Sequence, residues 1–293
     1  MLYRGKHVSH RRLRTAASLV MLFLVAALLI YPWVEPMLLQ VDSRSIAIAS
    51  LPAGVGQLRI VYLTDIHESG WPFFTHGAVR DLVRRVNSLN PDIVLLGGDY
   101  AVDSDSAIAF FQDLPRINSN YGVYGVMGNH DRTVPESNLS RLRAAMFAAG
   151  VTPLVNETAS IRIGTSDIYL AGLDDVDNGW PDLQGLARQV KQEDFVIFLS
   201  HSPAVIPNAL TATDASGHKS WFDLGLFGHT HGGQIALLGQ LLGISKVNPR
   251  YEHGWIVENK INMLISNGVG TSVLPLRFLR PPQIHLITVR RGS

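Results

Sequence analysis

The sequence predicts an α/β fold, and two observations carry this prediction. Short apolar runs, rich in β-branched and aromatic residues, stop at glycine or at polar clusters, which is typical of strands buried on both faces. Helix-like patterns separate these runs, and strands that alternate with helices indicate the α/β class. From about Arg44 onward there is no repeat, low-complexity stretch or long linker, so we expect one domain over residues 44–293.

Local sequence patterns and helix-ending residues predict the individual strands and helices. Residues 45–49 alternate as a strand does, and the runs that we expect to be buried strands are Leu58–Leu63, Ile93–Leu96, Gly122–Met127, Phe195–Leu199 and Leu224–Phe227. The expected helices are Gly77–Leu89, Ser106–Gln112, Asn138–Ala149 and Leu183–Gln192. Pro91 follows the first helix and Gly150 closes the third, as helix-ending residues do.

Composition excludes several classes of function. The 293 residues contain no cysteine, which excludes disulfides, thiolate catalysis, zinc fingers and iron–sulfur clusters. Apolar residues make up 46% and charged residues 17%, which suits a sizeable core and not a disordered chain. The first 34 positions hold five basic residues and no acid, so the rest of the chain carries 20 basic and 24 acidic groups. This balance argues against a polyanion-binding body, and we expect no nucleic-acid surface.

Residues 16–34 form an uncharged apolar stretch that is long enough to cross a membrane. Tyr31 and Trp33 lie near its end, where aromatic rings favour the headgroup level of a bilayer. The basic residues that precede it are Arg4, Lys6, Arg11, Arg12 and Arg14. A buried core helix is the alternative, but the position near the N-terminus, behind a basic flank, disfavours it.

We expect residues 1–15 to be a basic cytoplasmic tail and residues 16–34 to be an uncleaved anchor. The positive-inside rule then places the body of the chain outside the cytoplasm. A cleaved signal peptide is the competing interpretation, but its small-residue cleavage site should follow the apolar region closely. Ala47-Ile48-Ala49 lies well beyond Val34, and Arg11-Arg12 fits a twin-arginine signal poorly.

Histidine, carboxylate and amide side chains follow five of the expected strands. In chain order they are Asp65 and His67, then Asp99, then Asn129, His130 and Asp131, then His201, and last His229 and His231. Each motif alone has an ordinary explanation as a turn or a capping residue. Because ligands in α/β folds gather beyond the carboxyl ends of the strands, the set as a whole predicts one site.

The chemistry of this set suits a metal centre. Imidazole together with carboxylate and amide oxygen suits Mn, Fe, Zn, Co or Ni, and the lack of thiolate argues against a structural zinc. Seven such ligands are too many for one ion with an open position and suit two ions that share a carboxylate. Asp65 and Asp99 neutralise only part of the charge of two divalent ions, and the remainder would hold a bridging hydroxide and an anionic substrate.

In their order along the chain, these motifs resemble the calcineurin-like metallophosphoesterases. The matching motifs are Asp65-Ile66-His67, Gly98-Asp99, Gly128-Asn129-His130-Asp131, His201 and Gly228-His229-Thr230-His231, and the match covers about Arg44 to Val289. The continuation through Gly232-Gly233-Gln234, with Asn267–Gly270 and Leu274–Arg277, resembles a membrane-anchored bacterial phosphodiesterase branch. The resemblance implies a four-layer sandwich of two mixed β-sheets flanked by helices.

The resemblance also implies roles for the site residues. Asp65, His67 and His231 would bind the first ion, Asn129, His201 and His229 the second, and Asp99 would bridge the two. His130 would be no ligand; it would stabilise the phosphoryl transition state or protonate the leaving oxygen, with Asp131 orienting its ring.

Two groups of residues are candidates for contacts with substrate. Asn129 and Arg277 could bind phosphate, although a surface or helix-capping role is the alternative for the arginine. Trp71, Phe73 and Phe74 could form an apolar lid over an acyl chain, with core packing as the default interpretation.

We therefore expect a binuclear-metal phosphohydrolase, tethered to a bacterial cell membrane through residues 16–34. It would cleave phosphodiesters or phosphomonoesters, lipid-linked ones included, with the metal-bridging hydroxide as nucleophile. One alternative is a UDP-diacylglucosamine pyrophosphatase of lipid A synthesis, which requires a cytoplasmic site. The other is a non-catalytic, metal-bound scaffold, which the complete ligand set and His130 oppose.

Overall fold

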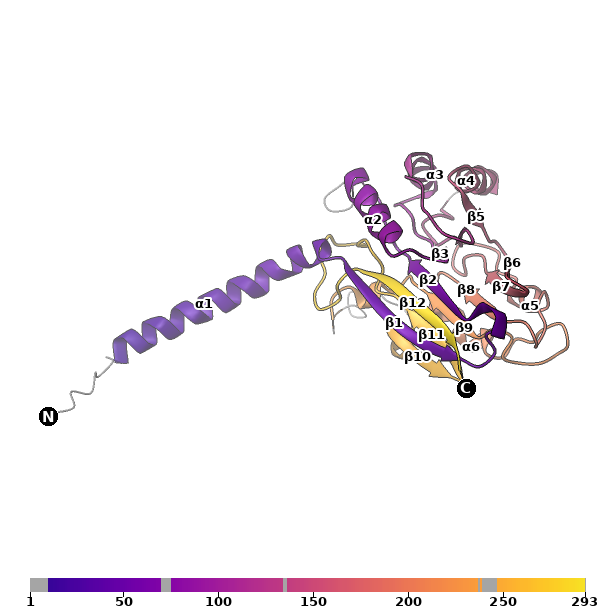
Figure 1. Cartoon of the computed structure of the whole chain (residues 1–293). Coiled ribbons are helices and arrows are strands. Elements are labelled where there is room, and N and C mark those ends of the chain that lie inside the picture. The colour runs from indigo at the N-terminus through magenta and orange to yellow at the C-terminus, as the bar shows by residue number, and fades with distance from the viewer. Residues whose placement is uncertain (1–9, 70–74, 134–135, 237, 239–246, 293) are drawn as a thin grey trace.

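The body of the molecule is a sandwich of two six-stranded mixed sheets (Figure 1). The computed structural model describes residues 10–69, 75–133, 136–236, 238 and 247–292. The strands of the first sheet, in spatial order, are β1 (Gln40–Ile48), β12 (Gln283–Arg291), β2 (Gln57–Leu63), β3 (Ile93–Leu96), β4 (Val123–Gly125) and β5 (Val151–Pro153). Those of the second are β10 (Gly254–Glu258), β11 (Ile261–Ile265), β9 (Leu224–Phe227), β8 (Val196–Leu199), β7 (Ser166–Gly172) and β6 (Glu157–Ile163).

Helices cover the outer faces of both sheets, which confirms the predicted four-layer class. The helices are α1 (His10–Val34), α2 (His76–Ser88), α3 (Ser104–Asp113), α4 (Glu136–Ala148), α5 (Leu183–Ala187) and α6 (Ile206–Ala209). Figure 1 shows α2, α3 and α4 together on one side of the first sheet. The expected helix at 183–192 is shorter than predicted, because the chain after Ala187 closes in two i→i+3 bonds, at Gln189 and Val190.

Three apolar layers hold the four structural layers together. Along β2 the side chains alternate: Leu58, Ile60 and Tyr62 face the core between the sheets, while Val61 and Leu63 face α2 and α3. The third layer packs α5 and α6 against the outer face of the second sheet. Strands that are buried on both faces read as continuous apolar runs, which is why these strands could be located from the sequence.

In each sheet, parallel pairing places the carboxyl ends of the strands at the same edge. β2, β3 and β4 are mutually parallel in the first sheet, and β7, β8, β9 and β11 are parallel in the second. Their carboxyl ends therefore open on the same side of each sheet, where the turns bring side chains together.

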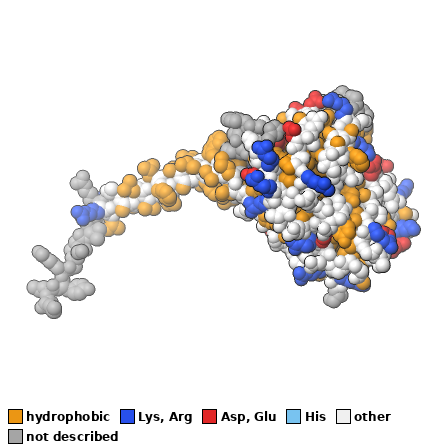
Figure 2. Space-filling view, turned by 45° about the horizontal axis from the view of Figure 1, so that its top comes forward, with side chains coloured by type: hydrophobic (Ala, Val, Ile, Leu, Met, Phe, Trp, Pro, Cys, Tyr) orange, Lys and Arg blue, Asp and Glu red, His pale blue; other side chains and the backbone are white. Residues whose placement is uncertain are grey.

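The long helix α1 projects from the body ahead of β1 (Figure 1). The 26-residue span Arg12–Met37 is apolar, and its most apolar part is not buried against the body, so by length and composition it is a candidate membrane span. It is the one such helix in the described residues. Figure 2 shows apolar side chains along the visible face of this helix. Arg4 and Lys6 of the basic flank lie outside the described residues.

A short segment after α1 is built into the body. Glu35, in the turn Glu35–Met37, is fully buried, and its Oε2 accepts the backbone N–H of Leu279 at 2.7 Å. The first strand begins at Gln40, ahead of the expected domain start at Arg44. We therefore propose that the folded domain begins at Glu35.

A chain shortened to residues 35–293 should stay folded, because it keeps Glu35 and all of β1. A chain shortened to residues 44–293 loses the bond to Leu279 and four residues of the first strand. A loss of 1 kcal/mol in the free energy of unfolding lowers the Tm of a domain of this size by about 2–4 °C. The Tm of the 44–293 chain should therefore be roughly 5 °C lower than that of the 35–293 chain. Thermal unfolding with Mn²⁺ supplied measures the difference. Equal Tm values would show that Glu35 is dispensable.

Candidate metal centre

All seven predicted metal ligands lie in the turns that follow five parallel strands. Asp65 and His67 follow β2, Asp99 follows β3, Asn129 follows β4, His201 follows β8, and His229 and His231 follow β9. The turn residues come from both sheets, so the site lies where the two carboxyl edges meet. Asp65, His67, Asp99, His201 and His231 are buried, whereas Asn129 and His229 are partly exposed.

Five of the seven residues have a left-handed backbone. The φ angles are +52° at Asp65, +47° at His67, +53° at Asp99, +69° at His229 and +51° at His231. Such conformations are rare outside glycine and cost on the order of 1–3 kcal/mol each, so the surroundings must hold them. Backbone bonds from Asp65 N–H to Gly98 O (2.9 Å) and from His67 N–H to Asp99 O (3.1 Å) join the turn after β2 to the turn after β3.

Glycine precedes Asn129 and His229 because at both positions the backbone passes close to a buried carboxylate. A Cβ built on Gly228 would fall against Oδ2 of Asp65, and one built on Gly128 would fall against Oδ1 of Asp99. Glycine at these two positions lets the neighbouring turns approach the carboxylates directly.

The first group of donor atoms is formed by His67, His231 and Asp65. The two Nε2 atoms of His67 and His231 face each other at 3.1 Å. Oδ1 of Asp65 lies 3.4 Å from Nε2 of His231, and Oδ2 of Asp99 lies 3.5 Å from Nε2 of His67. Two imidazole nitrogens and two carboxylate oxygens thus converge on one point.

The second group shares Asp99 with the first. Nε2 of His201 lies 3.2 Å from the same Oδ2 of Asp99, and Nδ1–H of His201 donates to Gly97 O at 2.8 Å. That bond leaves Nε2 directed at the site, as in metal-ligating histidines. Beside it, Nδ1 of His229 lies 3.0 Å from Oδ1 of Asn129.

Burial keeps three of the imidazoles neutral. It lowers the pKa of His67 and of His229 to about 4, and that of His231 well below its ordinary value. Burial also raises the pKa of Asp65 to about 6. Neutral imidazoles present lone pairs to a cation without first losing a proton.

Asp99 and His201 behave as a charged pair. Burial alone would raise the pKa of Asp99, but the charge of His201 and its hydrogen bond hold it well below the usual range. Burial likewise opposes the charge on His201, yet Asp99 and Asp65 raise its pKa well above the ordinary value. The surroundings of Asp99 thus favour a positive charge.

The donor set fits divalent cations. Three triads within the described residues each have ligand atoms within 4.8 Å of one another: Asp65–His67–His231, Asp65–Asp99–His201 and His67–Asp99–His130. Neutral imidazole and carboxylate are ligands that first-row divalent metals accept. Asp65, His67 and Asp99 each belong to two of these triads, and Oδ2 of Asp99 is the oxygen that lies near both His67 Nε2 and His201 Nε2.

His130 and Asp131 have different partners from those expected. Nδ1–H of His130 donates to Val102 O at 2.9 Å, and its ring stands edge-on to that of His67 with the centroids 4.9 Å apart. Asp131 instead accepts three backbone N–H groups, those of Asp99 (2.7 Å), Gly128 (2.8 Å) and Tyr100 (3.1 Å). The expectation that Asp131 orients the ring of His130 is therefore wrong, because both of its oxygens hold the turns.

Arg277 is not placed to bind a phosphate group. Its side chain is fully buried, and burial lowers its pKa to about 10. The guanidinium donates to the backbone oxygens of Asn267 (2.7 Å), Arg280 (2.8 Å) and Gly270 (3.1 Å). The structure therefore supports neither phosphate binding by Arg277 nor a surface or helix-capping role. The side chain instead cross-links two loops.

The pocket over the metal ligands contains residues that sequence reasoning missed. It has a volume of about 470 Å³, and its lining includes Asp99, Asn129, His130, His229, Asp177, Asn178, Ser272 and Val273. Oδ2 of Asp177 lies 3.8 Å from Nε2 of His229, and Asn178 Nδ2 donates to Asn129 O at 2.9 Å. The loop after β7 does carry a polar cluster, Asp174–Asn178, but no strand was expected at 166–172, so this signal at a strand end was not used.

The aromatic lid candidates cannot be placed at this pocket. Trp71, Phe73 and Phe74 lie outside the described residues. Their proposed role over an acyl chain therefore stays a prediction.

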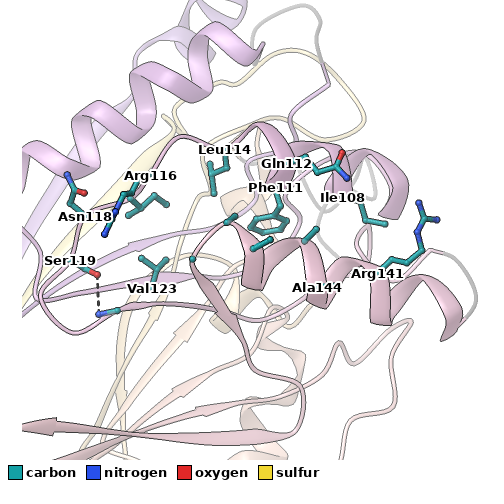
Figure 3. Close-up of a pocket in the computed structure, with 16 residues that line it drawn as sticks. Ile108, Phe111, Gln112, Leu114, Arg116, Asn118, Ser119, Val123, Arg141 and Ala144 are labelled. Carbon is teal, nitrogen blue, oxygen red and sulfur yellow. Dashed lines mark hydrogen bonds between the residues drawn. The ribbon is translucent and has the colours of Figure 1, made fainter.

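A larger hollow, of about 990 Å³, lies away from the metal centre. Figure 3 shows Phe111 between Arg116 on one side and Arg141 on the other. Val123 and Gly150, which also line it, stand at the amino ends of β4 and β5, opposite to the ends that carry the metal ligands. Its lining contains no histidine or carboxylate, so we assign it no part in the metal chemistry.

Comparison with known proteins identifies the family. The model of the calcineurin-like phosphoesterase family matches residues 58–233, a range that contains all seven predicted ligands. The chain belongs to the calcineurin-like phosphoesterase family. It is a metal-dependent phosphoric ester hydrolase, and the scaffold alternative is not supported.

Relatives of this phosphoesterase include bacterial and animal proteins. It is 29% identical over 265 residues to an uncharacterized metallophosphoesterase, YkuE, of Bacillus subtilis (strain 168), with 88% of each chain covered. A transmembrane protein with metallophosphoesterase domain of Bos taurus is 29% identical over 252 residues, which are 81% of this chain and 54% of that protein. Among solved structures, a dimetal phosphatase from Danio rerio aligns with a TM-score of 0.46 and 12% identity, over 72% of this chain and 88% of that one.

Replacing Arg277 with Met should destabilise the phosphoesterase and not simply weaken substrate binding. The change leaves the carbonyls of Asn267, Gly270 and Arg280 without this donor, and the first two belong to buried residues. We expect a loss of about 3 kcal/mol in the free energy of unfolding, or roughly 6 °C or more in Tm. Arg143→Met is the matched control, because that guanidinium is partly exposed and pairs with Glu157 at the surface. An unchanged Tm with a KM raised tenfold would instead restore the phosphate-binding role.

Proposed function

We propose that this phosphoesterase uses two divalent ions, held by the seven ligands in two groups. Asp65, His67 and His231 hold the first ion, Asn129, His201 and His229 hold the second, and Asp99 bridges them. The single observation that carries this assignment is the position of Oδ2 of Asp99, 3.5 Å from His67 Nε2 and 3.2 Å from His201 Nε2. When bound, the ions supply Lewis acidity and an activated, bridging hydroxide for attack on phosphorus.

His130 acts on the substrate in this proposal. Its Nδ1–H is engaged by Val102 O, so Nε2 remains for a phosphoryl or leaving-group oxygen in the pocket that His130 shares with Asp99 and His229. Asp131 acts as a positioning residue. By accepting the N–H groups of Asp99 and Gly128, it fixes the turns on which the bridging carboxylate and His130 stand.

The helix α1 anchors the enzyme as a single-pass membrane protein in a bacterial cell membrane. Its length, its apolar composition and the relative of Bos taurus named as a transmembrane protein support this proposal. The basic residues before the span and their absence just after it favour a catalytic domain outside the cytoplasm. That orientation counts against the UDP-diacylglucosamine pyrophosphatase alternative.

The direct test is hydrolysis of bis(p-nitrophenyl) phosphate and of p-nitrophenyl phosphate by the Mn²⁺-loaded protein. Turnover that disappears with a chelator and returns with Mn²⁺ supports the proposal. No turnover of either ester, with two ions bound per chain, would contradict it.

Asp99→Asn should lower both metal content and turnover, because it removes the charge that the two ions share. Elemental analysis should fall from two ions per chain to one or fewer. Asp81→Asn, at an exposed carboxylate on α2, is the control and should change neither quantity. Two ions still bound in Asp99→Asn would rule out the bridging role.

His130→Ala should keep both ions and lose about 10²-fold in kcat, on the order of 3 kcal/mol, as expected when one preorganised donor is removed. If His130 is the acid, an alkyl phosphodiester should suffer more than an aryl one, whose phenolate leaves without a proton. His218→Ala, at a half-exposed histidine away from the pocket, is the control. Loss of an ion in His130→Ala would make His130 a ligand, an assignment that the triad with His67 and Asp99 would permit.

A further inference from the structure

The end of α1 is fastened to the loop that supports the metal centre. The backbone N–H of Arg277 donates to Pro32 O at 2.9 Å, and the N–H of Leu279 donates to Glu35 Oε2 at 2.7 Å. The ring of Phe278 stands edge-on to that of Tyr31, with the centroids 6.0 Å apart. Three consecutive residues, Arg277–Leu279, therefore contact the end of α1. Figure 1 shows the loop that contains them beside the helix.

The same arginine reaches a proposed metal ligand. While its backbone holds Pro32, Nη2 of Arg277 lies 3.4 Å from Nδ1 of His231. One residue thus spans the distance between the end of α1 and the metal centre. The catalytic pocket must lie at the end of the domain from which the helix leaves.

An apolar surface surrounds this junction. We call it the anchor-side patch; its members and their exposed fractions are Met37 (63%), Leu38 (46%), Leu238 (47%), Val273 (79%), Leu274 (38%) and Leu279 (56%). The other large apolar side chains that are exposed in the described residues after α1 belong to other segments of the chain: Val102, Tyr121, Phe147, Trp180 and Val257. Exposed apolar side chains that gather in one place mark an interaction surface.

Hydrogen bonds join the segments of the patch into one unit. Gln234 Nε2 donates to Leu274 O at 2.8 Å, and Gln234 Oε1 accepts the N–H of Ser272 at 2.8 Å. Ile235 and Phe278 form a β-bridge. The segments 34–38, 234–238 and 272–279 contain two charged residues, Glu35 and Arg277, and both are fully buried. Within these three segments the patch presents apolar groups without an exposed charge. At its border Arg280, which follows Leu279, is half-buried; its Nε donates to Gly232 O at 2.6 Å, and its Nη2 lies 3.0 Å from Nε2 of His253.

We propose that the anchor-side patch lies in the headgroup layer of the membrane that α1 crosses, and that the enzyme acts on phosphoester headgroups of lipids in that membrane. The patch continues directly from the apolar surface of α1, so one bilayer covers both. Val273 belongs to the patch and also lines the pocket with Asp99, His130 and His229, so the pocket opens beside the membrane surface. The choice of substrate rests on the proposed hydrolase function, whereas the contact with the bilayer does not.

Membrane contact can be tested without measuring enzyme activity, by the fluorescence of a label attached to an introduced cysteine. The natural chain has no cysteine, so the label attaches at the introduced position. Leu279→Cys, labelled with an NBD fluorophore in the full-length protein, is placed in phosphatidylcholine–phosphatidylglycerol vesicles that carry a nitroxide near the headgroup. Phe147→Cys, whose side chain is 73% exposed on α4, is the matched control. We expect a blue shift and at least twofold quenching at position 279 and neither change at position 147.

Two results would overturn the contact with the bilayer. One is an equal response at positions 279 and 147. The other is a blue shift at 279 that needs no vesicles and grows with protein concentration in detergent, because it would assign the patch to a second copy of the chain.

The substrate class is tested with Leu38→Asp/Leu279→Asp, which puts charge into the patch and leaves the lining of the pocket unchanged. Leu279 has φ +55°, a conformation that Asp tolerates. The double variant should hydrolyse bis(p-nitrophenyl) phosphate as the wild type does but lose tenfold or more on vesicles that contain phosphatidic acid and phosphatidylglycerol. Val257→Asp, at an exposed residue of β10, should lose nothing on either substrate.

The two proposals fail in different ways. If the wild type cleaves the chromogenic diester but neither lipid, or if the double variant loses both activities equally, the lipid assignment is wrong and the hydrolase proposal stands. If neither substrate is cleaved by metal-loaded wild type, the hydrolase proposal fails, and the fluorescence experiment alone decides the contact with the bilayer.

Discussion

Two buried carboxylates organise this molecule. Asp65 and Asp99 lie almost wholly out of water, where a charge is costly unless it is hydrogen-bonded and paired. Asp65 accepts the backbone N–H of His229 with both oxygens at 3.0 Å, and Asp99 accepts that of His130 at 2.9 Å. Each carboxylate thus ties its own turn to a turn from a distant part of the chain. Satisfying these two groups brings the edges of the two sheets together and gathers the imidazoles around them.

The turns around the carboxylates are held by more bonds than a loop needs. Five left-handed residues would be unstable alone, but backbone bonds between neighbouring turns and the three N–H groups bound by Asp131 leave them no alternative. The result is a donor set that is aimed before any cation arrives. Such preorganisation is what a site for two ions requires, because like charges must be held at close range.

Arg277 extends this network from the candidate metal centre to the end of α1. Its guanidinium joins the loops around Asn267 and Gly270, its Nη2 approaches His231, and its backbone holds Pro32. An arginine that is fully buried and donates to three backbone oxygens acts as a structural cross-link and not as a ligand for anions. The position of the candidate catalytic pocket relative to α1 is therefore set by Arg277 together with the contacts of Phe278 and Leu279 to the end of the helix, and the anchor-side patch follows from that position.

The sequence by itself determined the α/β class, the five strands that end at the site and the residues that follow them, because strands buried on both faces must be continuously apolar and their turns must carry the polar groups. The apolar span 16–34 could also be predicted from the sequence, since its length and its lack of charged residues define it. The tertiary structure alone decided the tasks of Arg277 and Asp131 and the burial of Glu35. In each of these cases the deciding partner is a backbone group or a loop far away in the chain. Such partners leave no periodicity and no local motif, so only the folded molecule reveals them.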